Sequence, residues 1–258
     1  MIIVKDLKKR FTQDGPFITD GVNLEIPSGK MTCIIGRSGE GKSVLLKQII
    51  GLIRPTSGQV IIDDMDITKL SDKELTKVFK KMGYVFQFAA LLDSLNVLEN
   101  VGLPLLEKGM ALKDVEVIVR QKLALVDLSA DETLHKYPSE LSGGMKKRVG
   151  LARTLVTEPE IILYDEPTTG LDPITTRIIH ELMASMQKKL KITSVVVSHD
   201  LEIFKYVDKV ALLEDRKIQY FGDAATIWES NNPYVHQFIH GLSEGPIQTE
   251  LIHSKDKF

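Results

Sequence analysis

One eight-residue segment has the composition of a phosphate-binding loop. Residues 36–43 read GRSGEGKS, which matches G-x-x-x-x-G-K-[ST], between an apolar run and a helical stretch at 42–52. Glycine lets the backbone approach phosphate closely, and N–H groups at a helix start face the anion. We expect Lys42 to reach the β- and γ-phosphates of a nucleotide and the Ser43 hydroxyl to bind Mg²⁺. The nucleotide-binding residues expected here are Gly36, Arg37, Ser38, Gly39, Glu40, Gly41, Lys42, Ser43 and Val44.

A glycine-rich turn before an ordinary helix is the alternative interpretation of this loop. Glu40 also places an acid in it. We expect the Glu40 side chain to point to solvent, because a carboxylate that faces a polyphosphate would weaken binding.

An apolar run at 161–164 ends in two adjacent carboxylates, Asp165 and Glu166. In an open α/β sheet, the carboxyl ends of the strands lie at the ligand-binding edge. Successive strand residues point in opposite directions, so the two acids can take different roles. Asp165 suits the Mg²⁺ shell, and Glu166 suits the general base that polarises the water attacking the γ-phosphate. A structural pair of acids in a turn is the alternative.

Two further polar residues lie at the ends of apolar runs. His199 follows 194–198 and could contact the γ-phosphate and hold Glu166. Gln87 follows 84–86 and could sense the metal and the attacking water. Taken alone, a histidine is more often structural, and a single glutamine carries no specific signal.

A second helix start suited to an anion lies far from the first in the chain. Ser142 can cap the following helix, and Gly143 and Gly144 leave backbone N–H groups accessible. A nucleotide needs only one such helix start within its own chain. A head-to-tail pair of chains would use both, with Ser142, Gly143 and Gly144 closing on the nucleotide of the partner. An ordinary capped helix after a glycine turn is the alternative.

These residues need a sheet that brings strand ends together. β-rich runs alternate with helical stretches, which is typical of a mostly parallel sheet covered by helices. The expected strands are Ile2–Asp6, Val22–Ile26, Met31–Ile35, Gln59–Ile62, Tyr84–Phe86, Ile161–Asp165, Ser194–Ser198, Val210–Leu213 and Lys217–Tyr220. Between about 88 and 157 the strands stop, and helical patterns occur at 97–106, 115–126 and 142–155. We predict an α/β domain over 1–240 with a helical subdomain inserted at about 88–157, followed by a tail at 241–258.

Composition and charge limit the classes of protein to which this chain can belong. The chain has 258 residues, of which 43% are hydrophobic and 26% charged, with a net charge of −2, a profile typical of soluble globular proteins. This near-balance gives no support for a nucleic-acid partner. The single cysteine, Cys33, is expected in a buried strand. No apolar run is long enough to span a bilayer and no secretory signal is found, so we expect a cytoplasmic protein that meets a membrane through a partner.

In order along the chain, these motifs resemble those of the ATP-binding cassette (ABC) family. GRSGEGKS, Gln87, LSGGM, IILYDEP, Gly170–Asp172 and His199 are similar to its Walker A, Q-loop, signature, Walker B, D-loop and H-loop. The resemblance implies a P-loop NTPase core with an inserted helical subdomain, ATP and Mg²⁺ as cofactors, and ATP hydrolysis that powers an integral membrane permease. It implies that two copies sandwich two ATP molecules, with Asp172 in the nucleotide-binding set. By position, Phe11 resembles the residue that stacks on adenine, although a core or surface phenylalanine is a rival.

Within the family, the chain is most similar to the Mla/Mce-associated ATPases of bacterial lipid transport. The similar segments include 86–97, the signature with Met145 where glutamine is usual, and 237–246. This resemblance implies phospholipid transport, a peripheral position on the cytoplasmic side of the inner membrane, and as further partners a small STAS-like accessory protein and an MCE lipid-binding protein. Gly170 departs from the broader family, in which alanine is common. A non-lipid ABC importer is the main alternative, ahead of a soluble ABC ATPase and a P-loop kinase.

Two apolar sets are expected to meet other proteins. The first follows Gln87 and consists of Phe88, Leu91, Leu92, Leu95 and Val97. We expect part of it to pack inside the helical subdomain and the remainder to form a groove for a permease helix. The second lies near the C-terminus. Its members Tyr234, Phe238 and Leu242 share one helical face, and Ile247, Leu251 and Ile252 would anchor on a second chain or an accessory protein. A frayed tail without a role is the alternative.

Overall fold

The computed structural model describes residues 1–248, and their main sheet has six strands in the order β10-β9-β3-β8-β7-β6. Neighbouring strands are parallel except for the β9–β10 hairpin. The strands are β3 (Met31–Ile35), β6 (Met82–Val85), β7 (Ile161–Asp165), β8 (Thr193–Val197), β9 (Lys209–Glu214) and β10 (Lys217–Asp223). Every residue of β3, β7 and β8 is buried, as expected for central parallel strands covered on both faces. The predicted α/β fold with a mostly parallel sheet is confirmed.

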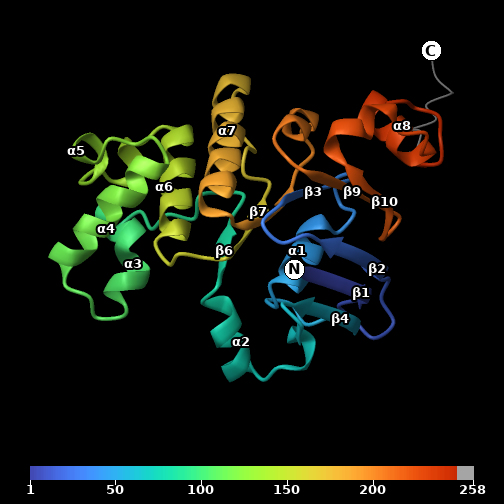
Figure 1. The fold of residues 1–258 in the computed structure, drawn as a ribbon, viewed down its shortest axis with the longest axis horizontal. Coiled ribbons are helices and arrows are strands. Elements are labelled where there is room, and N and C mark those ends of the chain that lie inside the picture. Colours follow the sequence, from blue (N-terminus) through green and yellow to red (C-terminus); the bar gives the residue numbers. More distant parts are fainter. Residues whose placement is uncertain (249–258) are drawn as a thin grey trace, which may run out of the picture.

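Three of the predicted strands belong to a second, antiparallel sheet, which the sequence analysis did not separate from the first. Its order is β2-β1-β4-β5. The strands are β1 (Ile2–Lys9), β2 (Thr19–Ile26), β4 (Ser57–Ile62) and β5 (Met65–Asp66). Buried and more exposed positions mix along β1 and β2, because only one face of this sheet is fully packed. Figure 1 shows the second sheet below β10, and β2 contacts β10 directly.

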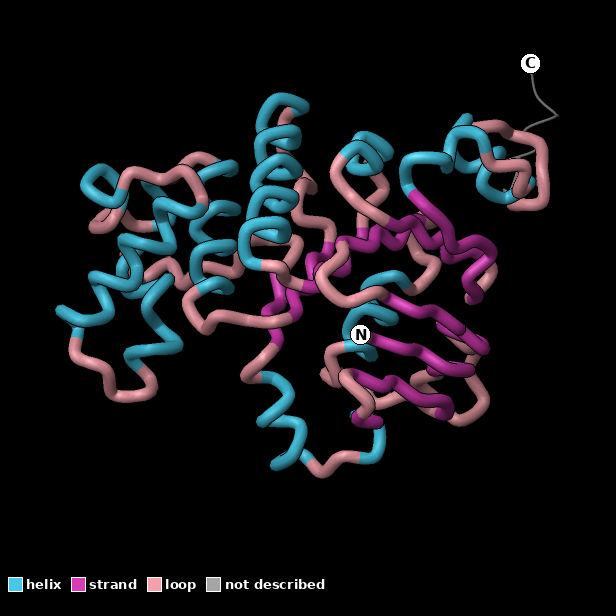
Figure 2. The backbone as a smooth tube through the Cα atoms, viewed as in Figure 1, coloured by secondary structure: helices cyan, strands magenta, loops and turns pink. Residues whose placement is uncertain are grey.

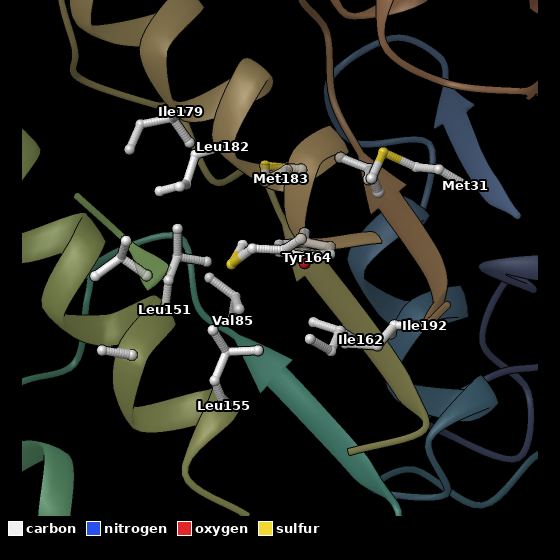
Figure 3. Close-up of a cluster of buried hydrophobic side chains, with 14 of the residues drawn as sticks. Met31, Val85, Leu151, Leu155, Ile162, Tyr164, Ile179, Leu182, Met183 and Ile192 are labelled. Carbon is white, nitrogen blue, oxygen red and sulfur yellow. The ribbon is translucent and has the colours of Figure 1, made fainter. Parts of the chain in front are cut away.

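Two hydrophobic cores lie on opposite faces of the main sheet. On one face, the helix α1 (Lys42–Ile49) packs between the main sheet and the antiparallel sheet. On the other face, Tyr164 of β7 lies in a hydrophobic cluster with Leu155, which precedes the strand in the chain, and Met183, which follows it (Figure 3). Cys33 is fully buried in this second core, as predicted. Since β7 is packed on both sides, its carboxyl end has a fixed position in the molecule.

Four helices lie between β6 and β7 in the chain, where no strand is present. They are α3 (Val97–Leu106), α4 (Leu112–Leu125), α5 (Ala130–Thr133) and α6 (Gly143–Leu155). They gather at one side of the molecule, and α7 (Pro173–Leu190) separates them from α1 (Figures 1 and 2). The three helical patterns expected in this block are confirmed, with α4 beginning at Leu112, three residues before the expected start.

Several elements differ from the sequence-based expectation. Helix α1 ends at Ile49 rather than at 52, because Gly51 takes a left-handed φ of 83°. Strand β6 covers Met82–Val85, so Phe86 lies beyond it and is exposed. The helices α2 (Asp72–Phe79) and α7 were not predicted, nor were four short 3₁₀ segments at Ile67–Lys69, Pro138–Glu140, Leu201–Lys205 and Ala224–Glu229. Within residues 1–248, no helix combines the length and the apolar character needed to cross a membrane.

The C-terminal part of the described chain folds back on the helix α8 (Pro233–His240). Gly241 ends this helix with a left-handed φ of 62°, so Leu242 lies beyond it, and only Tyr234 and Phe238 share the expected helical face. The buried Gln237 side chain then holds Ile247: its Oε1 accepts from the Ile247 N–H at 2.7 Å, and its Nε2 donates to the Ile247 carbonyl at 3.0 Å.

The expectation that Ile247 anchors on another chain is therefore wrong. Its side chain is only 5% exposed and packs within its own chain. Leu251 and Ile252, the other two expected anchors, lie outside the described residues. The segment 242–248 is thus an extension of the folded domain.

Substitution of Gln237 by methionine should release this segment without unfolding the domain. The change keeps the side-chain volume but removes the bonds to Ile247 and a third bond from Nε2 to the Leu242 carbonyl at 3.2 Å. Each such bond contributes on the order of 1 kcal/mol, so hydrogen exchange at the Ile247 amide should accelerate at least about tenfold. Gln248→Met is the matched control, because among residues 1–248 only the backbone carbonyl of Gln248 forms a hydrogen bond, with Arg37. Equal protection of Ile247 in both variants would contradict this account.

Candidate functional site

The phosphate loop occupies the turn between β3 and α1, as predicted. Gly36 has a φ of 154°, and a Cβ there would lie 2.2 Å from the Leu213 carbonyl oxygen. Gly41 has a φ of 88°, and a Cβ there would lie 2.7 Å from a methyl carbon of Ile18. Both positions therefore require glycine, because neighbouring backbone and side chains leave no room for a larger residue. The loop is therefore packed against the rest of the chain at both ends, and it places the start of α1 at the carboxyl edge of the sheet.

Lys42 lies inside this loop with only 5% of its surface exposed. Its Nζ donates to the carbonyl oxygens of Gly36 and Arg37, each at 2.8 Å. Burial lowers the pKa of Lys42, and the nearby carboxylates of Glu166, Glu40 and Asp165 oppose this shift. The lysine is a cation enclosed by carbonyls and carboxylates, which suits a group that must attract the anionic end of a nucleotide.

Asp165 ends strand β7 and is held by one hydroxyl on each carboxylate oxygen. The Ser43 hydroxyl donates to Oδ1 at 2.6 Å, and the Tyr84 hydroxyl donates to Oδ2 at 2.7 Å. Asp165 is 8% exposed, so both oxygens would be costly to leave unpaired. The sequence analysis missed Tyr84, although its position two residues before the end of an apolar run could have signalled it. Burial and Asp165 raise the pKa of Tyr84 well above its usual value, so its hydroxyl stays protonated and donates.

The donor set at Ser43 and Asp165 fits Mg²⁺. A hydroxyl and a carboxylate are hard oxygen ligands, and Mg²⁺ usually binds one or two protein oxygens, with phosphate and water completing its shell. Among residues 1–248, no group of three or more His, Cys, Asp or Glu side chains could hold a metal by itself. This is compatible with a metal that shares its ligands with a nucleotide.

Glu166 brings several polar groups to one point. Its backbone has a left-handed φ of 46°, and its N–H donates to the Val197 carbonyl at 3.0 Å. Its side-chain Oε2 accepts from Gln87 Nε2 at 3.3 Å and from the Thr169 hydroxyl at 3.1 Å. His199 Nδ1 lies 3.7 Å from the same oxygen. Two residues expected near Glu166 therefore lie there, together with Thr169, which the sequence analysis missed.

The two oxygens of the Glu166 carboxylate have different surroundings. The three neighbouring groups all face Oε2, whereas no hydrogen bond to Oε1 is found within the described part of the chain. One oxygen is thus anchored and the other is left to accept a proton. A carboxylate that is fixed in orientation but keeps one accepting oxygen suits a general base.

Glu40 does not point freely to solvent, which corrects the expectation for this residue. Its side chain is 16% exposed and pairs with Arg37, whose Nη2 lies 3.0 Å from Glu40 Oε1. The same Arg37 guanidinium pairs with the buried Glu214 of β9 and donates to the Gln248 carbonyl at 2.8 Å. Two carboxylates around one guanidinium explain why an acid is tolerated here, because its charge is offset within the loop.

The structure does not bring Ser142, Gly143 and Gly144 to the phosphate loop of their own chain. They begin α6, which Figure 1 shows on the far side of α7 from α1. Ser142 caps α6, since its hydroxyl accepts from the Met145 N–H at 3.2 Å, and Ser142 and Gly143 are exposed. This helix start is open to the outside of the molecule, where only another molecule could use it.

Two other residues of the expected nucleotide set also lie apart from the loop. Asp172 caps α7, accepting from the N–H groups of Ile174 and Thr175 at 3.0 Å each, and its hydrogen bonds with Thr175 lower its pKa. Phe11 is 63% exposed in the segment after β1, with Lys9 Nζ 5.1 Å from its ring centre. That segment reaches the phosphate loop through Ile18, which borders Gly41.

Known proteins resemble this chain over most of its length. The family model described as ABC transporter matches residues 19–169. A protein of Mycobacterium leprae named as a probable ribonucleotide transport ATP-binding protein is 41% identical over 95% of this chain and 70% of its own length. An intermembrane phospholipid transport ATP-binding protein of Haemophilus influenzae, MlaF, is 38% identical over 96% of this chain and 93% of its own. A methionine import ATP-binding protein of Carboxydothermus hydrogenoformans is 38% identical over 98% and 75%. The mycobacterial relatives are longer than this chain, which spans 64–70% of them.

Solved structures agree with this fold. A dimer of the ATP-binding cassette MJ0796 in a post-hydrolysis state, bound to ADP and phosphate, superposes with a TM-score of 0.79 and is 34% identical, over 87% of this chain and 99% of that one. That neighbour holds the products of ATP hydrolysis on the same fold.

Substitution of Glu166 by glutamine should leave ATP binding intact and reduce turnover by about 10²–10⁴-fold. The amide keeps the shape and the neighbours of Oε2 but cannot take a proton from water. Steady-state phosphate release and equilibrium ATP binding measure the two effects separately. Glu160→Gln is the control, because Glu160 precedes the same strand, and its carboxylate pairs with the surface residue Lys81 and with no other side chain of the described residues. Near-normal turnover in Glu166→Gln would rule out Glu166 as the base.

Proposed function

The chain belongs to the ABC transporter family and hydrolyses ATP, and from that premise we propose that it powers a phospholipid transporter of the Mla/Mce type. The supporting observation is the match with MlaF, which extends over 96% of this chain and 93% of that relative. This likeness extends beyond residues 19–169, which the family model matches, and over nearly the whole of that relative. A methionine import ATPase matches with the same identity, so a non-lipid importer is the second candidate.

In the proposed mechanism, the phosphate loop and Lys42 hold the β- and γ-phosphates of ATP. The Ser43 hydroxyl and the Asp165 carboxylate would hold Mg²⁺, which offsets the charge that develops on the transferred phosphoryl group. Glu166 Oε1 accepts a proton from the attacking water, while Gln87 and His199 keep the carboxylate oriented through Oε2. Their positions around the end of β7 support these proposed roles.

We propose that the active unit contains two copies of the chain. Ser142, Gly143 and Gly144 begin α6, which lies apart from their own phosphate loop, and a helix start of this kind can bind an anion. In a head-to-tail dimer they would close on the γ-phosphate of the partner, with Asp172 near the same interface and Phe11 against the adenine. Each ATP would then lie between the phosphate loop of one chain and the signature segment of the other.

The segment after Gln87 is proposed as the contact with a membrane permease. Phe88 is 73% exposed and Leu92 47%, whereas Val97 is buried and Leu91 and Leu95 are half-buried. The buried Asn100 fixes this loop: its Nδ2 donates to the Leu92 carbonyl at 3.0 Å, and its Oδ1 accepts from the Leu92 N–H at 2.8 Å. Exposed apolar side chains on a fixed loop suit a site for a partner helix.

The transporter would place this chain peripherally on the cytoplasmic side of the inner membrane. By its likeness to the Mla/Mce group, we propose a small STAS-like protein and an MCE lipid-binding protein as further members of the complex.

A mixing experiment tests the proposed dimer. Lys42→Ala disables the phosphate loop and Ser142→Arg disables the signature segment, so each homodimer should be inactive. A mixed dimer contains one site with both changes and one site with neither. ATPase activity should therefore return on mixing, to as much as about half of wild type per mixed dimer if one site can turn over alone. If both residues served only the ATP of their own chain, mixing would restore no activity.

A membrane purification tests the proposed transporter. The tagged chain should co-purify with an integral membrane permease, whereas Phe88→Asp should lose it and keep its own ATPase activity. Phe221→Asp is the control, because Phe221 is exposed on β10, away from the helical subdomain.

Reconstitution of that complex then distinguishes the two candidate substrates. The complex should move a labelled phospholipid between vesicles in an ATP-dependent manner, and the Glu166→Gln complex should not. Uptake of methionine without phospholipid movement would instead support the importer.

A further inference from the structure

One face of α6 holds the backbone that follows strand β6. Lys147, Gly150 and Arg153 recur every three residues, so they lie along one side of the helix. Lys147 Nζ donates to the Gln87 carbonyl, and Arg153 donates to the carbonyls of Ala89 at 2.9 Å and Ala90 at 2.8 Å. At Gly150, a Cβ would lie 3.2 Å from the Ala89 carbonyl oxygen, so the two backbones are close.

These backbone carbonyls lie beyond the end of the strand, so they do not form hydrogen bonds within the sheet. Strand β6 ends at Val85, and the chain then leaves the sheet, with Ala90 in a left-handed conformation at a φ of 50°. Backbone carbonyls outside a sheet need other donors when solvent access is limited. Side chains of α6 provide these donors, so the path of residues 87–90 depends on where α6 lies.

Lys147 is the member of this set that touches Gln87 directly. It is only 8% exposed, and burial lowers its pKa. Within residues 1–248 its side chain forms no ion pair with a carboxylate, and its Nζ donates to the Gln87 carbonyl. Burial of a cation with a carbonyl as partner is unfavourable for stability alone, which indicates a role other than general stabilisation.

We propose that Lys147 is a positioning residue for the catalytic base. It fixes the backbone of Gln87, and the Gln87 amide in turn orients Glu166 through Oε2. Lys147 lies five residues after Ser142, on the helix whose start is proposed to contact the ATP of the partner. Helix α6 therefore joins a contact with one ATP to the base that acts on the other. This inference rests on the proposed function, because it assumes that Glu166 is the base of an ATP-hydrolysing dimer.

The first test separates turnover from binding. Lys147→Met keeps the length and removes the donor, so turnover should fall about tenfold while the Kd for ATP stays unchanged, the effect expected when one positioning hydrogen bond is lost. Lys147→Arg can still donate to the carbonyl and should recover most of the rate. Lys146→Met is the control, since no hydrogen bond or ion pair of the Lys146 side chain is found among the described residues, and the substitution leaves its backbone bond to the Ser142 carbonyl in place. Wild-type turnover in Lys147→Met would overturn the inference.

Mixed dimers distinguish positioning from a general effect on α6. In the mixture of Lys42→Ala and Ser142→Arg chains, the working site takes its Gln87 and Glu166 from the Ser142→Arg chain and its signature from the Lys42→Ala chain. Lys147→Met should lower the restored activity about tenfold only when placed in the Ser142→Arg chain. A loss only when Lys147→Met is placed in the Lys42→Ala chain would mean that Lys147 supports the signature helix, and an equal loss from either chain would mean a general effect on the fold. Either result would overturn the inference. Both mixtures contain one copy of the variant, so a loss of stability affects them equally.

The outcomes also separate this inference from the proposed function. A wild-type protein that fails to hydrolyse ATP would contradict the proposed function itself. Active wild type and unaffected Lys147→Met would contradict only the role of Lys147.

Discussion

The rest of this site must provide polar partners for two adjacent carboxylates at the end of a buried strand and for a buried lysine close by. Asp165 and Lys42 are each less than one-tenth exposed, and Glu166 is half-buried, so each needs polar partners nearby. The partners come from α1, from the two strands that flank β7, and from the segments that follow the three strands. The Ser43 and Tyr84 hydroxyls bond Asp165, and Gln87, Thr169 and His199 lie at Glu166. The same groups that make burial tolerable also give the two acids different environments, one suited to a metal and the other to a proton.

The fold places the two segments that are proposed to bind ATP, the phosphate loop and the signature segment, on different parts of the chain. The phosphate loop belongs to the sheet and α1, whereas the signature segment belongs to the helices on the far side of α7. Along the chain, residues 86–96 connect β6 to those helices, and residues 156–160 connect the helices to β7. The first of these links carries Gln87 and the exposed Phe88, so one short segment touches the base, the signature helix and the proposed permease surface.

The sequence predicted the parts of the site that depend on local pattern. The spacing of glycines and an apolar run that ends in acids can both be recognised without tertiary structure. Such patterns predicted the phosphate loop, the strand β7 and the residues that gather around Glu166. Tyr84 was missed because its bond to Asp165 depends on the pairing of β6 with β7, which brings together residues 81 positions apart. The expectation for Glu40 was wrong because Arg37, three residues earlier, pairs with it while also bonding Glu214, 177 positions away. The expectation for Ile247 was wrong because the chain turns back after Gly241, which brings Ile247 to the Gln237 side chain ten residues earlier. The separate antiparallel sheet was missed because strand direction is not encoded in alternation alone.

The central claim is that one ATP lies between the end of β7 in one chain and the start of α6 in another. An experimental structure of the Glu166→Gln protein with ATP and Mg²⁺ tests it most directly. The account predicts a dimer in which Ser43 and Asp165 face one metal, the side chain at position 166 faces the γ-phosphate, and Ser142 of the second chain contacts the same phosphate. ATP bound to a monomer, or a dimer in which Ser142 lies away from both nucleotides, would contradict it.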